Sequence, residues 1–145
     1  MHGQPRQPDG LVAVAANPRS SNGAARRALR RRVAAMGRPC WICGLPIDYG
    51  LPGGHPLSYE LDEVIPVSKG GSPIDPENVA PAHRCCNQWR SDKDADRVRA
   101  VREAVRSRWG SWRTPMQFIA MAKAVIKGLA RRIPRPGGLD TSRRW

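Results

Sequence analysis

The chain has 145 residues and a formal net charge of +13, made up of +7 for residues 1–39, −3 for residues 40–93 and +9 for residues 94–145. This length allows one domain with a modest core. Because there is no N-terminal leader and no apolar run near the roughly 18 residues of a membrane span, we expect a cytoplasmic protein without a membrane segment. Basic flanks around an acidic centre favour phosphate binding outside and cation binding inside, although 21 Arg against 4 Lys also fits a solvated arginine face encoded by a GC-rich genome.

Two short segments open the chain. Residues 1–22 are rich in Pro, Gly, Asn and Ser and predict a flexible tail. Residues 23–36 predict a basic helix, because apolar residues recur between arginines at helical spacing, namely Ala25, Leu29, Val33 and Met36. Ser21 or Asn22 is the expected cap, and Gly37 the expected stop.

The middle of the chain predicts two short strands. Residues 44–56 hold four Gly and three Pro and predict a loop. Residues 57–62 alternate apolar and polar side chains as a half-buried strand does, and residues 78–80 predict a brief second strand. Between them, Pro66 limits the first strand and residues 70–73 mark a turn.

The last third predicts helices. One helix is expected over residues 85–109, with a stripe formed by Ala95, Val98, Val101, Val105 and Trp109. A capping box at residues 114–117 predicts a further helix to about residue 132, followed by a basic tail. The residues expected on its buried face are Ile119, Ala122, Ile126 and Leu129.

Four central residues have the spacing of a zinc site. Cys40-x-x-Cys43 supplies one half and His83-x-x-Cys86 the other, which gives a Cys3His set suited to tetrahedral, structural Zn²⁺. In a reducing compartment such cysteines are metal ligands rather than disulfides. Cys85 in place of His83 is the competing ligand, and ordinary buried thiols are a third interpretation.

A series of motifs then follows in a fixed order: Cys40-x-x-Cys43, Asp62-Glu63-Val64-Ile65-Pro66, Gly70-Gly71, Asn78-Val79, His83-x-x-Cys86, Asn87 and Lys93. In this order and spacing, residues 40–93 resemble the HNH endonuclease family, in its zinc-stapled ββα-metal form. The resemblance implies an α+β fold, in which a small ββα-metal hairpin with a structural zinc knuckle is flanked by basic α-helices. It also implies a metal-dependent DNA endonuclease. A phage subgroup with Asp-Glu at this point is similar and suggests the packaging terminase as a partner.

The resemblance also implies roles for individual residues. Asp62 and Asn87 would hold a catalytic Mg²⁺ or Mn²⁺, and Asn78 would pin the loop and orient the base. Glu63 stands where the family usually has the His that acts as general base, so it is either the base or another metal ligand. His55 is an alternative base that needs a loop folding back.

Further expectations concern nucleic acid and the domains. Four basic residues near this segment are expected to contact DNA phosphates: Lys69, Arg84, Arg90 and Lys93. A zinc-stabilised DNA-binding or packaging accessory protein with little catalysis is the rival prediction, and an RNA-binding or RNA-cleaving protein is a third. We expect a tail (1–22), a nuclease domain with its leading helix (23–109), and a basic C-terminal helix and tail (110–145).

Overall fold

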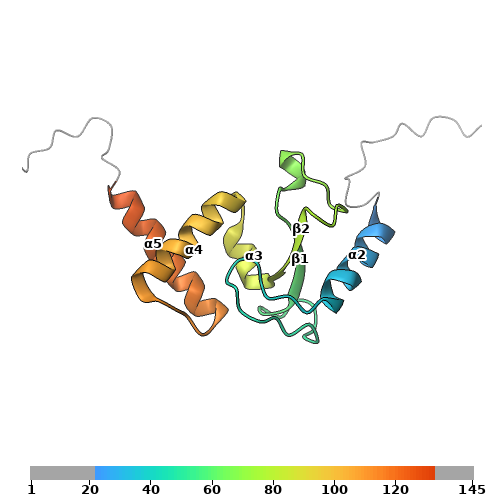
Figure 1. The fold of residues 1–145 in the computed structure, drawn as a ribbon, viewed down its shortest axis with the longest axis horizontal. Helices are drawn as coiled ribbons and strands as arrows, with labels where there is room; N and C mark the ends of the chain where they lie inside the picture. The colour runs from blue at the N-terminus through green and yellow to red at the C-terminus, as the bar shows by residue number, and fades with distance from the viewer. Residues whose placement is uncertain (1–21, 133–145) are drawn as a thin grey trace, which may run out of the picture.

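The computed structural model describes residues 22–132, so the predicted tails lie outside the described residues except for Asn22. The elements in chain order are α2 (Gly23–Ala35), β1 (Tyr59–Glu63), the 3-10 helix η1 (Val67–Lys69), β2 (Val79–His83), α3 (Arg84–Arg90), α4 (Ala95–Trp109) and α5 (Pro115–Arg132) (Figure 1). In this part of the chain the fold is mixed α/β, with a two-stranded antiparallel sheet. α2 lies on one side of the sheet, and the three later helices lie on the other (Figure 1). None of the described helices has the length and hydropathy needed to cross a membrane.

The two predicted strands form an antiparallel pair. Both begin later than residues 57–62 and 78–80 predict, and β2 extends to His83. They pair along their whole length. β2 continues through Pro81, whose carbonyl oxygen accepts a hydrogen bond from Trp41 N at 3.0 Å. This contact attaches the Cys-x-x-Cys turn to β2.

The single helix predicted over residues 85–109 is wrong, because the chain breaks between α3 and α4. Ser91 follows α3 with a φ of 49°, which residues other than glycine rarely adopt. Asp94 then caps α4, and its Oδ1 accepts from Arg97 N at 2.8 Å. Arg90 holds the turn through an Nε hydrogen bond of 3.0 Å to a carbonyl oxygen within it. The apolar residues continue at helical spacing, but the cap at Asp94 and the buried Arg90 divide the segment into two helices.

The first and last described helices agree with prediction. α2 buries Leu29 and Val33 of its stripe, whereas Met36 just after the helix is 53% exposed. α5 begins at the predicted capping box, where Thr114 Oγ1 accepts from Gln117 N at 3.1 Å. The described residues on its buried face are Phe118, Ile119, Ala122 and Val125, and the side chain of Leu129 lies outside the description.

Two apolar clusters hold these elements together. The larger one joins the cysteine-bearing segments to α4 and α5, and includes Ile42, Val98, Val105 and Phe118. The smaller one packs α2 against the sheet through Leu29, Val33, Tyr59, Leu61 and Val79. Because burial of each such side chain is worth about 1.5–3 kcal/mol, the clusters fix the sheet between α2 and the later helices. The charged end of β1 is thereby held between two helical layers.

Candidate functional site

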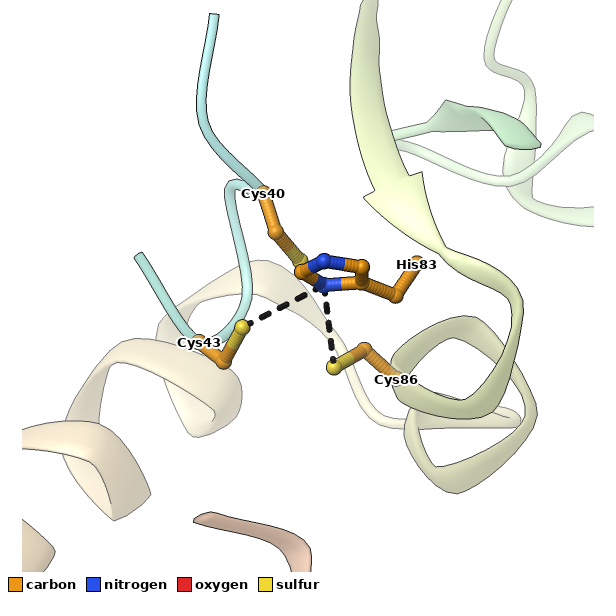
Figure 2. A group of neighbouring side chains, drawn as sticks. All are labelled: Cys40, Cys43, His83 and Cys86. Carbon is orange, nitrogen blue, oxygen red and sulfur yellow. Dashed lines mark hydrogen bonds between the residues drawn. The ribbon is translucent and has the colours of Figure 1, made fainter. Parts of the chain in front are cut away.

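The four predicted zinc ligands come together in a buried cluster (Figure 2). The ligand atoms of Cys40, Cys43, His83 and Cys86 all lie within 4.8 Å of one another. His83 Nε2 lies 3.0 Å from the carbonyl oxygen of Pro46, and because a carbonyl only accepts, Nε2 carries the proton. His83 Nδ1 therefore faces the thiols, 3.4 Å from Cys43 Sγ and 3.9 Å from Cys86 Sγ.

The Cys-x-x-Cys turn is held in shape by the chain around it. Gly44 has a φ of 76°, which allows the backbone to reverse directly after the second cysteine. Trp112 Nε1 donates to the Cys43 carbonyl at 2.8 Å, and Arg102 Nη1 donates to the Trp41 carbonyl at 2.8 Å. These donors belong to α4 and to the loop before α5, so the C-terminal helices order the first ligand pair.

The thiols of the cluster perturb one another. Burial opposes ionisation of Cys40, but hydrogen bonds from Cys43, Cys86 and His83 lower its pKa overall. Hydrogen bonding with Cys40 raises the pKa of Cys43 to about 12 and also raises the pKa of Cys86. Ligation of a divalent ion would replace the retained thiol protons. The donor set fits a structural metal such as Zn²⁺, held by three thiolates and one imidazole.

The competing ligand, Cys85, does not belong to this cluster. It is buried beside the cluster residue Cys86, but it lines an apolar groove against α5. The Cys3His set predicted from the spacing is therefore the set that the fold assembles.

A second candidate site is a polar cavity of about 390 Å³ beside β1 and α3. Asp62 and Asn87, far apart in the sequence, both line it, together with Glu63. The complete lining consists of Arg26, Arg30, Glu60, Leu61, Asp62, Glu63, Pro66, Asn87, Arg90 and Ser91. Three of the four predicted catalytic residues therefore share one space, and the fourth, Asn78, lies outside it.

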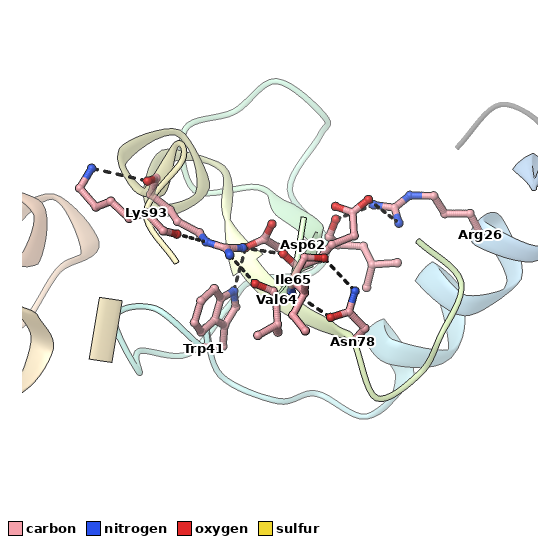
Figure 3. A network of polar contacts seen from close by, with 10 residues as sticks. Arg26, Trp41, Asp62, Val64, Ile65, Asn78 and Lys93 are labelled. Carbon is pink, nitrogen blue, oxygen red and sulfur yellow. Dashed lines mark hydrogen bonds and ion pairs between the residues drawn. The ribbon is translucent and has the colours of Figure 1, made fainter. Parts of the chain in front are cut away.

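Asp62 is buried and fixed through one oxygen. Its Oδ2 accepts from Arg90 Nη1 at 2.7 Å and from Trp41 Nε1 at 3.0 Å (Figure 3). Burial raises the pKa of Asp62 above its ordinary value, while the hydrogen bond and charge of Arg90 act in the opposite direction. Both of these hydrogen bonds fall on Oδ2, so Arg90 and Trp41 fix the orientation of the carboxylate.

Glu63 is 4% exposed and lies against α2. Its Oε1 is 3.4 Å from Arg26 Nη1 (Figure 3). Arg26 also donates to the carbonyl oxygens of Leu61 and Pro73. Arg30, one turn further along α2, donates to the Tyr59 carbonyl at 2.9 Å and also lines the cavity. α2 thus places two arginines in the lining of the cavity that also holds the carboxylates. The amphipathic pattern of this helix did not predict that contact.

Asn78 pins the loop that follows β1. Its Oδ1 accepts from Ile65 N at 2.9 Å, and its Nδ2 donates to Ile65 O at 2.9 Å (Figure 3). Nδ2 also donates to Ser72 O at 3.0 Å. Gly71 is required beside it, because a Cβ there would meet Ile65 O at 1.7 Å. The side chain of Asn78 therefore holds the loop that follows Glu63 in place through three hydrogen bonds to its backbone.

The four basic residues expected at the surface are placed differently from one another. Arg90 is 1% exposed, with its guanidinium bonded to Asp62 and to backbone carbonyls, so its expected role in contacting DNA phosphates is corrected. Lys93 Nζ donates to Trp89 O at 2.8 Å and is partly buried. Lys69 is exposed and Arg84 half-buried, so both can still reach a ligand.

One residue predicted from the sequence lies away from the cavity, and one residue that contacts Asp62 was not predicted. His55, the alternative base, is exposed, is not among the residues lining the cavity, and accepts at Nδ1 from Leu57 N at 3.0 Å. Trp41 was not predicted as a site residue, although it hydrogen-bonds Asp62. Its position beside the predicted zinc ligand Cys40 was the one feature of the sequence that could have indicated a role.

Comparison with protein-family models, with curated proteins and with solved structures finds nothing that matches this chain. The HNH resemblance therefore stays a prediction made from the order and spacing of the motifs in the sequence.

Proposed function

We propose that the protein is a metal-dependent DNA endonuclease of the HNH type, stabilised by a structural zinc ion. The observation that carries the proposal is the polar cavity that Asp62, Glu63 and Asn87 line together. Oxygen donors of a carboxylate and an amide are ligands that Mg²⁺ and Mn²⁺ accept. The donor set therefore fits the cation that the sequence resemblance implies.

Each residue would have a distinct task. Asp62 and Asn87 would hold the divalent cation, which when bound would stabilise negative charge on the phosphate and the departing oxygen. Glu63 accepts the proton of the attacking water. Arg90 and Trp41 orient Asp62 by occupying its Oδ2.

The arginines of α2 would bind the substrate. Arg26 and Arg30 line the same cavity as the carboxylates, and phosphates are bound by guanidinium groups. The remaining basic surface, including Lys69, supplies affinity that does not depend on base sequence. A packaging terminase as partner also belongs to this proposal, on the resemblance alone.

Plasmid cleavage tests the proposal directly. Zinc-loaded protein is incubated with supercoiled plasmid in Mg²⁺, in Mn²⁺ or in EDTA, and nicked and linear products are quantified. We expect cation-dependent nicking that Asn87→Ala abolishes. Gln88→Ala, an exposed position next along α3, is the control and should retain activity. Absence of nicking in every divalent ion, or full activity of Asn87→Ala, would contradict the proposal.

A second candidate function is a zinc-stabilised DNA-binding or packaging protein without catalysis. It is favoured by the contacts of Asp62 and Glu63 with arginines, because cations already neutralise the carboxylates. It is also favoured by the Glu in place of the usual His. Tight plasmid binding without any cut in the same experiment would support this candidate.

A further inference from the structure

A second hollow lies between α3 and α5. It has a volume of about 640 Å³, within the range of ligand clefts, and its apolar floor includes Trp89, Ile119 and Ile126. Met116, which also lines the hollow, is 57% exposed and so adds apolar surface that solvent can reach. The groove residues used below are Trp89, Lys93, Met116, Ile119, Lys123 and Lys127, which we call the lysine groove.

The lysine groove is separate from the polar cavity. Successive residues of a helix are rotated by about 100°, so residues 87 and 90 of α3 face away from residues 85, 88 and 89. The first pair lines the polar cavity and the second set lines the lysine groove. α3 therefore stands between them, and an occupant of one does not need to enter the other.

The charge of the groove is of one sign. Three of the four lysines of the chain line it, and none of the described lining residues is acidic. Lys123 and Lys127 are exposed one turn apart on α5. Lys93 is partly satisfied, since its ammonium lies 4.9 Å from the Trp89 ring centroid. The groove thus joins an apolar floor to a positively charged rim.

This combination defines the chemistry of an occupant. Phosphates of a nucleic acid would pair with the lysines but leave the apolar floor uncovered. Residues 133–145 of the chain itself carry three Arg and one Asp, so the rim would repel them. We infer that the lysine groove is a docking site for an acidic amphipathic segment of a partner protein, with apolar side chains in the groove and carboxylates on Lys123 and Lys127. Such helix-in-groove recognition uses apolar anchors for affinity and charges for specificity.

A displayed library of random peptides of about 12 residues, long enough for about three helical turns, provides the probe. Selection is made on the full chain loaded with zinc. We expect enriched peptides to combine Asp or Glu with Leu, Ile, Phe or Trp. Reversing both exposed charges (Lys123→Glu with Lys127→Glu) should weaken binding of an enriched peptide about tenfold or more. Changing the acids of that peptide to Lys should restore binding to the reversed variant.

A matched control separates this effect from net charge. Arg27→Glu with Arg31→Glu makes the same charge change one turn apart at exposed positions of α2, and should leave peptide binding unchanged. Zinc content and melting temperature establish that both variants fold. The inference is overturned if enriched peptides are not acidic or bind both double variants equally. It is also overturned if the α5 reversal abolishes only DNA binding, or only self-association measured by sedimentation.

Discussion

Replacement of Arg90 by Met is the sharpest test of how the polar cavity is held together. Arg90 is the largest of the fully buried side chains. Its Nη1 lies 2.7 Å from Asp62 Oδ2 and 2.6 Å from the Glu63 carbonyl oxygen, and its Nη2 donates to the Val64 carbonyl. The guanidinium also lies 4.9 Å from the Trp41 ring centroid. Met matches the aliphatic stem but removes every one of these polar contacts.

The magnitude follows from the burial of the pair. Asp62 would keep a buried charge with only the Trp41 N–H as donor, and breaking a buried ion pair from one side costs about 3–5 kcal/mol. The backbone carbonyls of Glu63 and Val64 would also lose their hydrogen bonds from Arg90, which adds to this cost where water does not reach them. Since a domain has about 5–15 kcal/mol of stability in all, we expect Arg90→Met to remove a large fraction of it.

A double-mutant cycle separates the ion pair from general packing. Asp62→Asn keeps an acceptor for Trp41 and removes the charge, so the double variant should recover about 1–3 kcal/mol of the summed single losses. Urea unfolding of zinc-saturated protein, followed by tryptophan fluorescence, gives each free energy of unfolding. Arg106→Met is the control, because Arg106 pairs with Glu103 at the surface and should change stability by less than about 0.5 kcal/mol. A loss below about 1 kcal/mol for Arg90→Met, or strictly additive losses, would refute the reasoning.

Three other predictions follow from the two sites. Cys86→Ser should prevent retention of one zinc per chain after dialysis, whereas the adjacent Cys85→Ser should retain it; metal analysis showing equal zinc in both would remove Cys86 from the ligand set. Glu63→Gln should lower plasmid cleavage by about 100-fold or more while DNA affinity stays the same or rises, and unchanged cleavage would assign the base elsewhere. Asn78→Ala removes three hydrogen bonds and should cost about 1–3 kcal/mol in urea unfolding; a neutral result would mean that the loop after β1 holds its shape without this side chain.

The parts that sequence predicted well depend on local spacing. The Cys3His cluster follows from two half-sites whose x-x spacing is the same, and zinc ligation tolerates whatever lies between them. α5 follows from its capping box, since the donor and acceptor lie three residues apart. The capping box lies within four residues, and the metal site needs only four residues of suitable type at the right spacing. Neither prediction therefore required knowledge of the tertiary structure.

The error between α3 and α4 shows the limit of such signals. An apolar period predicted one helix, whereas the structure begins a separate helix, α4, at a cap formed by Asp94. The chain breaks where Arg90 turns inward, and the partners of Arg90, on β1 and directly after it, lie 26 to 28 residues earlier in the chain.

The sequence by itself gave the spacing of the Cys3His set, the two strands and the order of acidic and amide groups along the chain. Only the tertiary structure decided that Arg90 is buried, that Cys85 stays out of the Cys3His cluster, that Arg26 and Arg30 of α2 line the polar cavity, and that Trp41, between two cysteines of that cluster, hydrogen-bonds Asp62. The physical reason is that the sequence does not distinguish a buried arginine from a solvated one. They differ only in the acceptors that packing brings to them, and those acceptors come from distant segments.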